Sequence, residues 1–199
     1  MALSHPWITG FSQASEKSTS ADTLTKSLKN IYVFKNLERL KKAVLTYIAT
    51  QLTEKESGSL KVVFQQFDKN GDGLITIEEL QSALSKFKTK EEIKEIMDSC
   101  DINLKGNIDY TEFIAATMDE SVYLQKDKLL AAFSEFDRDK SGKISAVELK
   151  EILGKGTDFN EKVWSDMIKQ VDTNGDGEID SDEFMAMMYD IRKQINKLK

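Results

Sequence analysis

Residues 68–79 read DKNGDGLITIEE, a stretch of twelve in which acidic and amide side chains are interrupted by glycine. The pattern returns at residues 101–112 (DINLKGNIDYTE), 137–148 (DRDKSGKISAVE) and 172–183 (DTNGDGEIDSDE), with starts 33, 36 and 35 residues apart. Each copy has aspartate first, glycine sixth, isoleucine eighth and glutamate twelfth. Such a period predicts one small structural unit that is used four times.

The spacing of oxygen-bearing side chains in these stretches suits a hard cation. Calcium takes about 6–8 oxygen ligands at roughly 2.3–2.6 Å from a loop that wraps around it. The four stretches resemble the calcium-binding loops of the EF-hand family. In that family, side-chain oxygens come from the first, third and fifth positions, a carbonyl from the seventh, a contact often made through water from the ninth, and both oxygens of a glutamate from the twelfth. Glycine at the sixth position permits the sharp bend, because it tolerates positive φ.

Three of the four loops, the first, third and fourth, have a complete set of donors, and the resemblance implies that they bind calcium. The implied ligands are Asp68, Asn70, Asp72, Leu74 (carbonyl), Thr76 and Glu79 in loop 1; Asp137, Asp139, Ser141, Lys143 (carbonyl), Ser145 and Glu148 in loop 3; and Asp172, Asn174, Asp176, Glu178 (carbonyl), Asp180 and Glu183 in loop 4.

The second loop departs from the pattern at its fifth position, where Lys105 replaces an oxygen donor. An ammonium has no lone pair and repels a cation. Two interpretations stay open: the lysine turns outward and water completes a fourth calcium site, or the loop is structural and only pairs with the first. If the loop binds calcium, its ligands are Asp101, Asn103, Asn107 (carbonyl), Asp109 and Glu112.

Helices are expected on both sides of every loop. Thr53-x-x-Glu56 and Thr89-x-x-Glu92 have the form of capping boxes, which begin helices. Apolar residues at helical spacing follow the first of them. The alternative, that the loops are only turns between helices, does not explain four copies in register. We therefore expect an all-α fold with two EF-hand pairs, calmodulin-like lobes at residues 53–118 and 129–199 that residues 119–128 link. In the EF-hand family the eighth position joins a short two-stranded β bridge to the neighbouring loop, so the resemblance implies that Ile75 pairs with Ile108 and Ile144 with Ile179.

Charge is distributed unevenly along the 199 residues, whose formal net charge is −6. Residues 26–52 carry six basic side chains against Glu38, whereas the chain from Thr53 onward carries a charge of −10. A basic segment before an acidic body predicts that the two pair with each other. The balance argues against nucleic acid as the main partner, since only one short helix could meet phosphates.

Residues 26–52 are expected to form one long amphipathic helix with an apolar stripe and with Lys35, Arg39 and Lys42 on the opposite side. It resembles the basic amphipathic targets that calmodulin-like lobes hold in a groove. A helix that lies on a membrane surface is the rival interpretation, but the acidic domain that follows favours a partner within the chain. The residues expected to make the contact are Phe34, Leu37, Lys41, Lys42, Val44 and Ile48.

The order of parts extends the resemblance to nearly the whole chain. Residues 3–8 (LSHPWI) resemble the end of a protein-kinase catalytic domain, although a chance match or a plain hydrophobic terminus is the alternative. A kinase remnant at residues 1–10, a linker at 11–25, an autoinhibitory junction at 26–52 and four loops resemble the calcium-dependent protein kinases of plants and protists. In that family a calmodulin-like domain follows the kinase through such a junction.

No catalytic or cofactor-binding residue other than calcium ligands is expected in this chain, because the nucleotide loop and the catalytic motifs of kinases are missing from it. The resemblance implies a regulatory fragment of a serine/threonine kinase. Its lobes would open on binding calcium, engage the junction helix and relieve inhibition of the parent kinase domain. A free-standing calcium sensor or buffer and a membrane-recruited calcium adaptor are the alternatives.

Cys100 is the only cysteine, which excludes an intramolecular disulfide and indicates a reducing, cytoplasmic setting. No apolar run reaches the ~18–20 residues of a membrane span, so no membrane contact is expected for this chain. An anchor upstream in the parent protein stays open. The chain is expected to be a monomer. Methionines near the loops either fill the core or line a groove that opens with calcium. They are Met97, Met118, Met167, Met185, Met187 and Met188.

Overall fold

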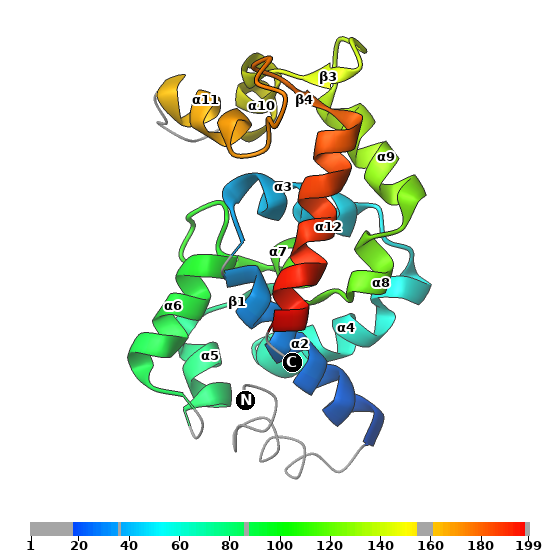
Figure 1. Ribbon diagram of the computed structural model, residues 1–199. Helices are drawn as coiled ribbons and strands as arrows, with labels where there is room; N and C mark the ends of the chain where they lie inside the picture. Colours follow the sequence, from blue (N-terminus) through cyan, green and yellow to red (C-terminus); the bar gives the residue numbers. More distant parts are fainter. Residues whose placement is uncertain (1–17, 36, 86–87, 155–160, 198–199) are drawn as a thin grey trace.

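Helices dominate the computed structural model, which describes residues 18–35, 37–85, 88–154 and 161–197 (Figure 1). The predicted kinase remnant at residues 1–10 lies outside this range. In chain order the elements are α2 (Ser18–Lys35), α3 (Arg39–Thr50), α4 (Glu54–Phe67), β1 (Leu74–Ile75), α5 (Ile77–Leu84), α6 (Lys90–Cys100), β2 (Ile108–Asp109), α7 (Tyr110–Thr117), α8 (Glu120–Tyr123), α9 (Lys126–Phe136), β3 (Lys143–Ile144), α10 (Ala146–Leu153), α11 (Glu161–Lys169), β4 (Ile179–Asp180) and α12 (Ser181–Lys197).

Every repeat folds as a helix, a loop and a second helix, and the repeats pair through two-residue strands. Strand β1 pairs with β2 in antiparallel register, with Ile75 opposite Ile108. Strand β3 pairs with β4 in the same way, with Ile144 opposite Ile179. These four isoleucines are almost fully buried, which explains why the eighth position of each loop is apolar. The predicted all-α class with two small β bridges is confirmed.

The capping boxes predicted from the sequence begin helices α4 and α6. The Thr53 amide donates to Oε2 of Glu56 at 2.9 Å, and the Thr89 amide donates to Oε2 of Glu92 at 2.9 Å. These bonds use backbone amides that a helix N-terminus would otherwise leave without partners.

The prediction of one continuous helix over residues 26–52 is wrong. Helix α2 ends at Lys35 and α3 begins at Arg39. Between them the Leu37 amide donates to the Phe34 carbonyl at 3.0 Å, and Glu38 adopts an extended conformation with ψ 156°. We call α2 and α3 together the junction.

Packing explains the break in the junction. Helix α2 contacts α4, α6 and α7, whereas α3 contacts α7 and α9, so the chain turns to place both helices against α7. Leu28 on α2 and Val44 on α3 are both buried, and so is Leu37 between the two helices. A straight helix would extend away from α7 and expose one set of these side chains. Tertiary burial therefore outweighs local helix propensity here.

Two segments predicted as linkers contain helix. Helix α2 begins at Ser18, inside the predicted linker 11–25, and its Leu24 is buried. Residues 119–128 connect the lobes as expected, but they hold the short helix α8, whose Tyr123 is 4% exposed. Both segments are anchored because each contributes an apolar side chain to the core.

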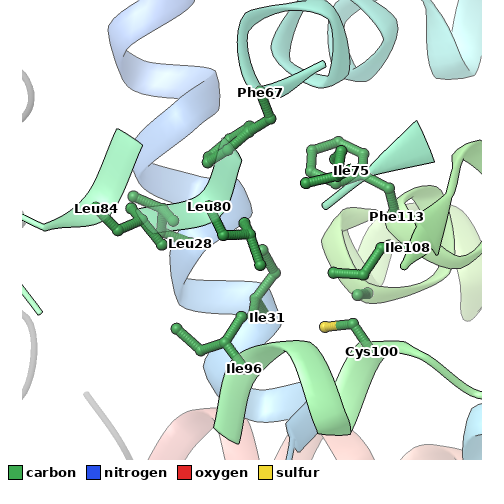
Figure 2. Close-up of a pocket in the computed structure, with 11 residues that line it drawn as sticks. Leu28, Ile31, Phe67, Ile75, Leu80, Leu84, Ile96, Cys100, Ile108 and Phe113 are labelled. Carbon is green, nitrogen blue, oxygen red and sulfur yellow. The ribbon is translucent and has the colours of Figure 1, made fainter. Parts of the chain in front are cut away.

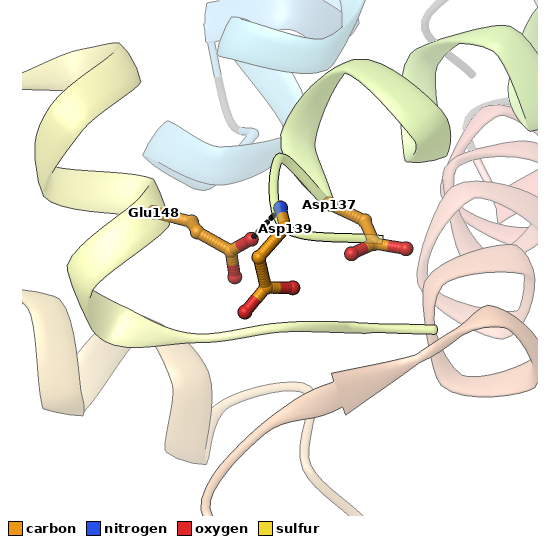
Figure 3. A group of neighbouring side chains, drawn as sticks. All are labelled: Asp137, Asp139 and Glu148. Atoms are coloured by element: carbon orange, nitrogen blue, oxygen red, sulfur yellow. Dashed lines mark hydrogen bonds between the residues drawn. The ribbon is translucent and has the colours of Figure 1, made fainter. Parts of the chain in front are cut away.

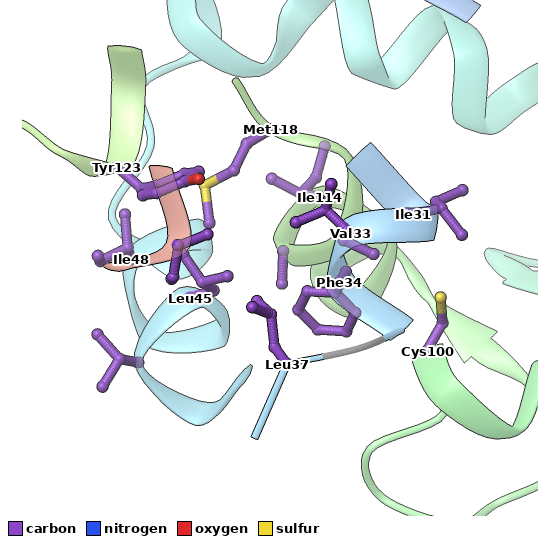
Figure 4. Packing of buried hydrophobic residues seen from close by; sticks show 14 of the residues in the cluster. Ile31, Val33, Phe34, Leu37, Leu45, Ile48, Cys100, Ile114, Met118 and Tyr123 are labelled. Atoms are coloured by element: carbon purple, nitrogen blue, oxygen red, sulfur yellow. The ribbon is translucent and has the colours of Figure 1, made fainter. Parts of the chain in front are cut away.

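One continuous apolar cluster joins the junction to both lobes. Figure 4 shows part of it, where Phe34, Leu37, Leu45 and Ile48 of the junction lie near Ile114, Met118 and Tyr123 of the first lobe and its connection. Five of the six methionines named above are buried, and Met185 is partly buried against the cluster. Their placement favours core filling over an exposed groove. Among the described helices, none combines the length and the apolar character needed to cross a membrane.

Candidate metal centre

The backbone bends in the same way in all four loops. The fourth and sixth residues of each loop have positive φ, including the two non-glycine residues Leu104 (59°) and Lys140 (62°). Positive φ is costly for a side chain with a Cβ. Loop 2 therefore has the same bend as loops 1 and 4 even though leucine occupies its fourth position. The presence of lysine at the fifth position of loop 2 does not change this backbone shape.

In each loop, backbone amides donate hydrogen bonds to the carboxylate of the glutamate at the twelfth position and hold it against the loop. In loop 3, Glu148 accepts from the amides of Arg138 at 2.8 Å, Asp139 at 3.3 Å and Ser145 at 2.8 Å. The corresponding bonds are made by Glu79, Glu112 and Glu183. The carboxylate that should close each site thus faces the start of its own loop.

The aspartate at the first position closes the other side of each bend. Its Oδ2 accepts the amide of the sixth-position glycine, at 3.0 Å for Asp137 and Gly142 and at 2.9 Å for Asp172 and Gly177. Besides its proposed contact with calcium, the side chain at the ninth position caps the helix that follows the loop. Ser145 accepts from the Glu148 amide at 3.3 Å in this role.

Loop 3 brings three carboxylates together. One oxygen each of Asp137, Asp139 and Glu148 lies within 4.8 Å of the other two. Figure 3 shows the three side chains. Two oxygens that share one calcium ion at roughly 2.3–2.6 Å cannot be more than about 5 Å apart. The donors are all hard oxygens, and their separation fits one cation of this size. The predicted ligands of loop 3 therefore fit calcium.

Loops 1 and 4 use asparagine at the third position, so fewer carboxylates converge there. Nδ2 of Asn70 donates to Oδ2 of Asp72 at 2.9 Å, and the Asp176 amide donates to Oδ1 of Asn174 at 2.9 Å. These contacts hold the third and fifth positions of each loop next to each other.

The electrostatic setting of the closing glutamate separates loop 2 from the others. Burial alone would raise the pKa of Glu79, Glu148 and Glu183, but hydrogen bonds from the loop backbone and the ninth residue outweigh it and lower each pKa. In loop 2, burial dominates and raises the pKa of Glu112. Loop 2 thus differs in its closing glutamate as well as in Lys105.

Lys105 itself is exposed, and its backbone amide donates to side chains within the loop. Its amide donates to Oδ1 of Asp101 at 3.0 Å and to Oδ1 of Asn103 at 3.2 Å. The exposure agrees with an ammonium that stays outside the loop. Both interpretations of loop 2, a water-completed site and a structural loop, remain compatible with this geometry.

The junction occupies the apolar face of the first lobe. Leu28 and Ile31 of α2 lie against Phe67, Leu80 and Leu84, leaving about 10 Å³ of residual space among them (Figure 2). At the edge of this contact, Nδ2 of Asn30 donates to the carbonyls of Thr117 at 2.8 Å and Met118 at 3.0 Å. These are carbonyls at the end of α7 that have no partner within the helix. Sequence reasoning missed Asn30, because its role depends on a helix end 87 residues away.

Basic residues of the junction do pair with acids of the body, and one of them is unexpectedly buried. Lys35 forms an ion pair with Glu95. Lys41 is 4% exposed and lies 3.4 Å from Oδ2 of Asp190 on α12 and 3.7 Å from Oε2 of Glu38. Its charge is therefore part of the contact between α3 and the second lobe.

The neighbouring Lys42 contacts the first lobe instead. Its Nζ donates to the Ser99 carbonyl at 2.9 Å and lies 5.1 Å from the ring centroid of Phe34. Burial lowers the pKa of Lys42. Both lysines named from the sequence thus contact the lobes, and neither lies on a purely solvated face.

Comparisons with known proteins agree with this geometry. A family model described as an EF-hand domain pair matches residues 59–118 and 126–189. Calcium-dependent protein kinase 4 of Plasmodium falciparum (isolate 3D7) is 35% identical over 94% of this chain and 38% of its own length. Calcium-dependent protein kinase 2 of Zea mays is 36% identical over 99% of this chain and 38% of its own length. Calcium-dependent protein kinase 19 of Oryza sativa subsp. japonica is 37% identical over 94% of this chain and 34% of its own length.

The chain thus spans little more than a third of the length of these relatives. The matched residues of the family model cover both lobes, from α4 to α12, and the similarity to the kinases extends over the junction as well. With four loops of one backbone shape, paired through two β bridges, the chain belongs to the EF-hand family and contains two EF-hand pairs.

Proposed function

We propose that this chain is the calcium-sensing regulatory part of a calcium-dependent serine/threonine protein kinase. Loops 1, 3 and 4 bind calcium through the ligands named above, and loop 2 is a candidate for a fourth ion. The junction is the element through which the lobes act on the kinase domain of the parent protein.

The observation that carries this proposal is the packing of the junction on both lobes. An EF-hand protein that only buffers calcium needs no such element. Here Leu28 and Ile31 fill the apolar face of the first lobe, while Tyr47 lies edge-on to Phe136 of the second lobe at 6.5 Å between ring centroids. Sensor EF-hands expose an apolar face when calcium changes their interhelical angle. A junction that contacts this face will respond to the change.

Calcium titration combined with hydrogen exchange tests the proposal. We expect binding with dissociation constants of about 10⁻⁷–10⁻⁵ M, the range of sensor EF-hands. Amide exchange in α2 and α3 should then differ between calcium and chelator. The triple variant Glu79→Gln, Glu148→Gln, Glu183→Gln should abolish the difference.

Calcium binding without any change of exchange in α2 or α3 would identify a buffer instead of a sensor. Absence of calcium binding would reject the proposal entirely. Sedimentation with anionic liposomes, with and without calcium, tests the membrane-adaptor alternative, which requires calcium-dependent pelleting.

The kinase part of the proposal is tested with a chimera. The segment of the maize relative that aligns with this chain is replaced by this chain, and phosphorylation of a peptide is followed against free calcium. We expect activation by calcium that Phe34→Ala with Ile48→Ala weakens. Activity that is independent of calcium in the chimera, but dependent in the relative itself, would contradict a regulatory role.

A further inference from the structure

The side chain of Lys143 leaves loop 3 and contacts loop 4. Its Nζ lies 2.6 Å from Oδ2 of Asp176 and 3.7 Å from Oε2 of Glu178. Lys143 is the seventh residue of loop 3, where it faces Asp180 across the β3–β4 pair. Asp176 is the fifth residue of loop 4 and one of its proposed calcium ligands. The ammonium group of Lys143 in loop 3 is therefore paired with a proposed calcium ligand of loop 4, the carboxylate of Asp176.

Loop 4 is strongly acidic, which makes an ion pair with Lys143 relevant to calcium binding. Residues 172–183 contain six acidic side chains and no basic one. These carboxylates repel one another when no cation lies between them. The ammonium of Lys143 relieves part of that repulsion from outside the loop. Any interaction that stabilises a protein more without a ligand than with it lowers the affinity for that ligand.

We propose that Lys143 is an internal competitor for calcium, which lowers the calcium affinity of loop 4 by holding Asp176 in an ion pair. The inference rests on the proposed calcium site in loop 4. When Asp176 turns its carboxylate to an ion in the loop, its bond to Lys143 must loosen. The lysine acts as an affinity-setting residue, and only its side chain has this role. Its backbone carbonyl, the proposed ligand in loop 3, is the same whichever side chain is present.

The first lobe lacks the competitor at the equivalent place. The seventh residue of loop 1 is Leu74, which faces Asp109 across β1–β2. The fifth residue of loop 2 is Lys105, so no carboxylate stands where Asp176 does. Lys143→Leu therefore copies the arrangement of the first lobe and keeps a residue that this strand position accepts.

The test uses the whole 199-residue chain and reads each loop separately. The amides of Gly73, Gly142 and Gly177 donate to the first aspartate of their loops at 3.0, 3.0 and 2.9 Å. Their NMR shifts in glycine-labelled protein, followed in buffers of known free calcium, report on loops 1, 3 and 4.

Three variants are compared with the unmodified chain. Lys143→Leu removes the competitor, and Lys143→Arg keeps its charge. Lys140→Asn removes one positive charge from the same loop without touching loop 4, since Nζ of Lys140 donates to Ser134. Asparagine also suits the positive φ at position 140.

We expect the Gly177 midpoint to move to about two- to five-fold lower free calcium in Lys143→Leu, the effect of losing one exposed ion pair. Lys143→Arg and Lys140→Asn should leave the Gly177 midpoint in place. The calcium midpoint of Gly73 should be the same in all three variants as in the unmodified chain. An unchanged Gly177 midpoint in Lys143→Leu, or an equal shift in Lys140→Asn, overturns the inference alone. A Gly177 amide that ignores calcium in every protein overturns the loop 4 site and the inference together.

Discussion

Each loop-closing glutamate is held in position by three backbone amides of its own loop, as described for Glu148. At the scale of single residues, this arrangement fixes a long side chain that would otherwise lose rotamer freedom on binding an ion. Binding then requires a small adjustment of a carboxylate that already faces the loop. The exact residue at position twelve should therefore matter more than the total negative charge nearby.

Replacing the closing glutamate tests this expectation. Glu79→Gln, Glu148→Gln or Glu183→Gln removes one charge and the two-oxygen grip, so each variant should lose one site or bind it at least about tenfold more weakly, roughly 1.4 kcal/mol. Calorimetric titration gives both the number of ions and their affinity. Glu78→Gln is the matched control, because the exposed Glu78 carries the same charge one residue before Glu79. If all three variants titrate like the control, the ligand assignment is wrong.

Loop 2 offers a gain-of-function test. Its backbone bend matches that of the other loops, so a carboxylate in place of Lys105 would meet a preformed shape. We expect Lys105→Asp to raise the affinity of this loop or to add one bound ion, as seen by the same titration. Lys105→Ala, which removes the charge without supplying a ligand, should have a smaller effect. Identical curves for the native chain and Lys105→Asp would show that the lysine is not what sets the behaviour of loop 2.

At the scale of elements, the junction shows where sequence reasoning ends. Four residues of the apolar stripe at 26–52 are buried in the structure: Phe34, Leu37, Val44 and Ile48. The same stripe gave no sign of the break between Lys35 and Arg39, because helical periodicity continues on both sides of it. The break depends on α7, which lies more than 70 residues later in the chain. A one-dimensional pattern cannot contain that constraint.

The buried anchors of α3 should dominate its contribution to stability. Ile48 is 0% exposed, whereas Arg39 on the same helix is exposed. Ile48→Ala should lower the free energy of unfolding by about 2–5 kcal/mol, and Ile48→Val by about 0.5–1.5 kcal/mol. Arg39→Ala should stay within about 0.5 kcal/mol of the native chain. Urea unfolding monitored by circular dichroism gives the three values, and a loss for Arg39→Ala as large as that for Ile48→Ala would contradict the packing described here.

The positive φ at the fourth and sixth residues of the loops was predictable in part, because the glycines that favour it recur at a fixed spacing within twelve residues. The strand register was predictable through the resemblance to EF-hand loops, since each bridge pairs the eighth positions of two adjacent loops. The contacts of Asn30, Lys41 and the Lys143 side chain were not, because each joins elements whose separation in space the sequence does not specify. The ligand assignments themselves stay predictions until ions are titrated.

At the scale of the whole molecule, the two lobes are tied together outside the junction as well. Lys128 at the start of α9 lies 2.9 Å from Oε1 of Glu56 in the first turn of α4. The same glutamate completes the capping box with Thr53. Hydrogen bonds from the Thr53 backbone, and then from Lys128, lower the pKa of Glu56 to about 2.

This lowered pKa makes a pH prediction with a defined sign. A carboxylate whose pKa is lower in the folded state stabilises the fold above its unfolded value, here 4.5, and the stabilisation is lost as pH falls towards 2. Glu56→Gln should therefore lower the urea midpoint at pH 7, and the difference from the native chain should shrink between pH 4.5 and pH 2. Glu54→Gln, an exposed change in the same helical turn, serves as the control. A difference that is constant over this pH range would exclude Glu56 as the source.

The bend between α2 and α3 also fixes a length. An unbroken helix from Ser18 to Thr50 would measure about 50 Å at 1.5 Å per residue, whereas helices of 18 and 12 residues measure about 27 and 18 Å and both return to α7. Helix α2 is thereby held against the first lobe along its length of 18 residues. Straightening the bend would move one of the two helices away from α7, so the segment between Lys35 and Arg39 sets the reach of the junction.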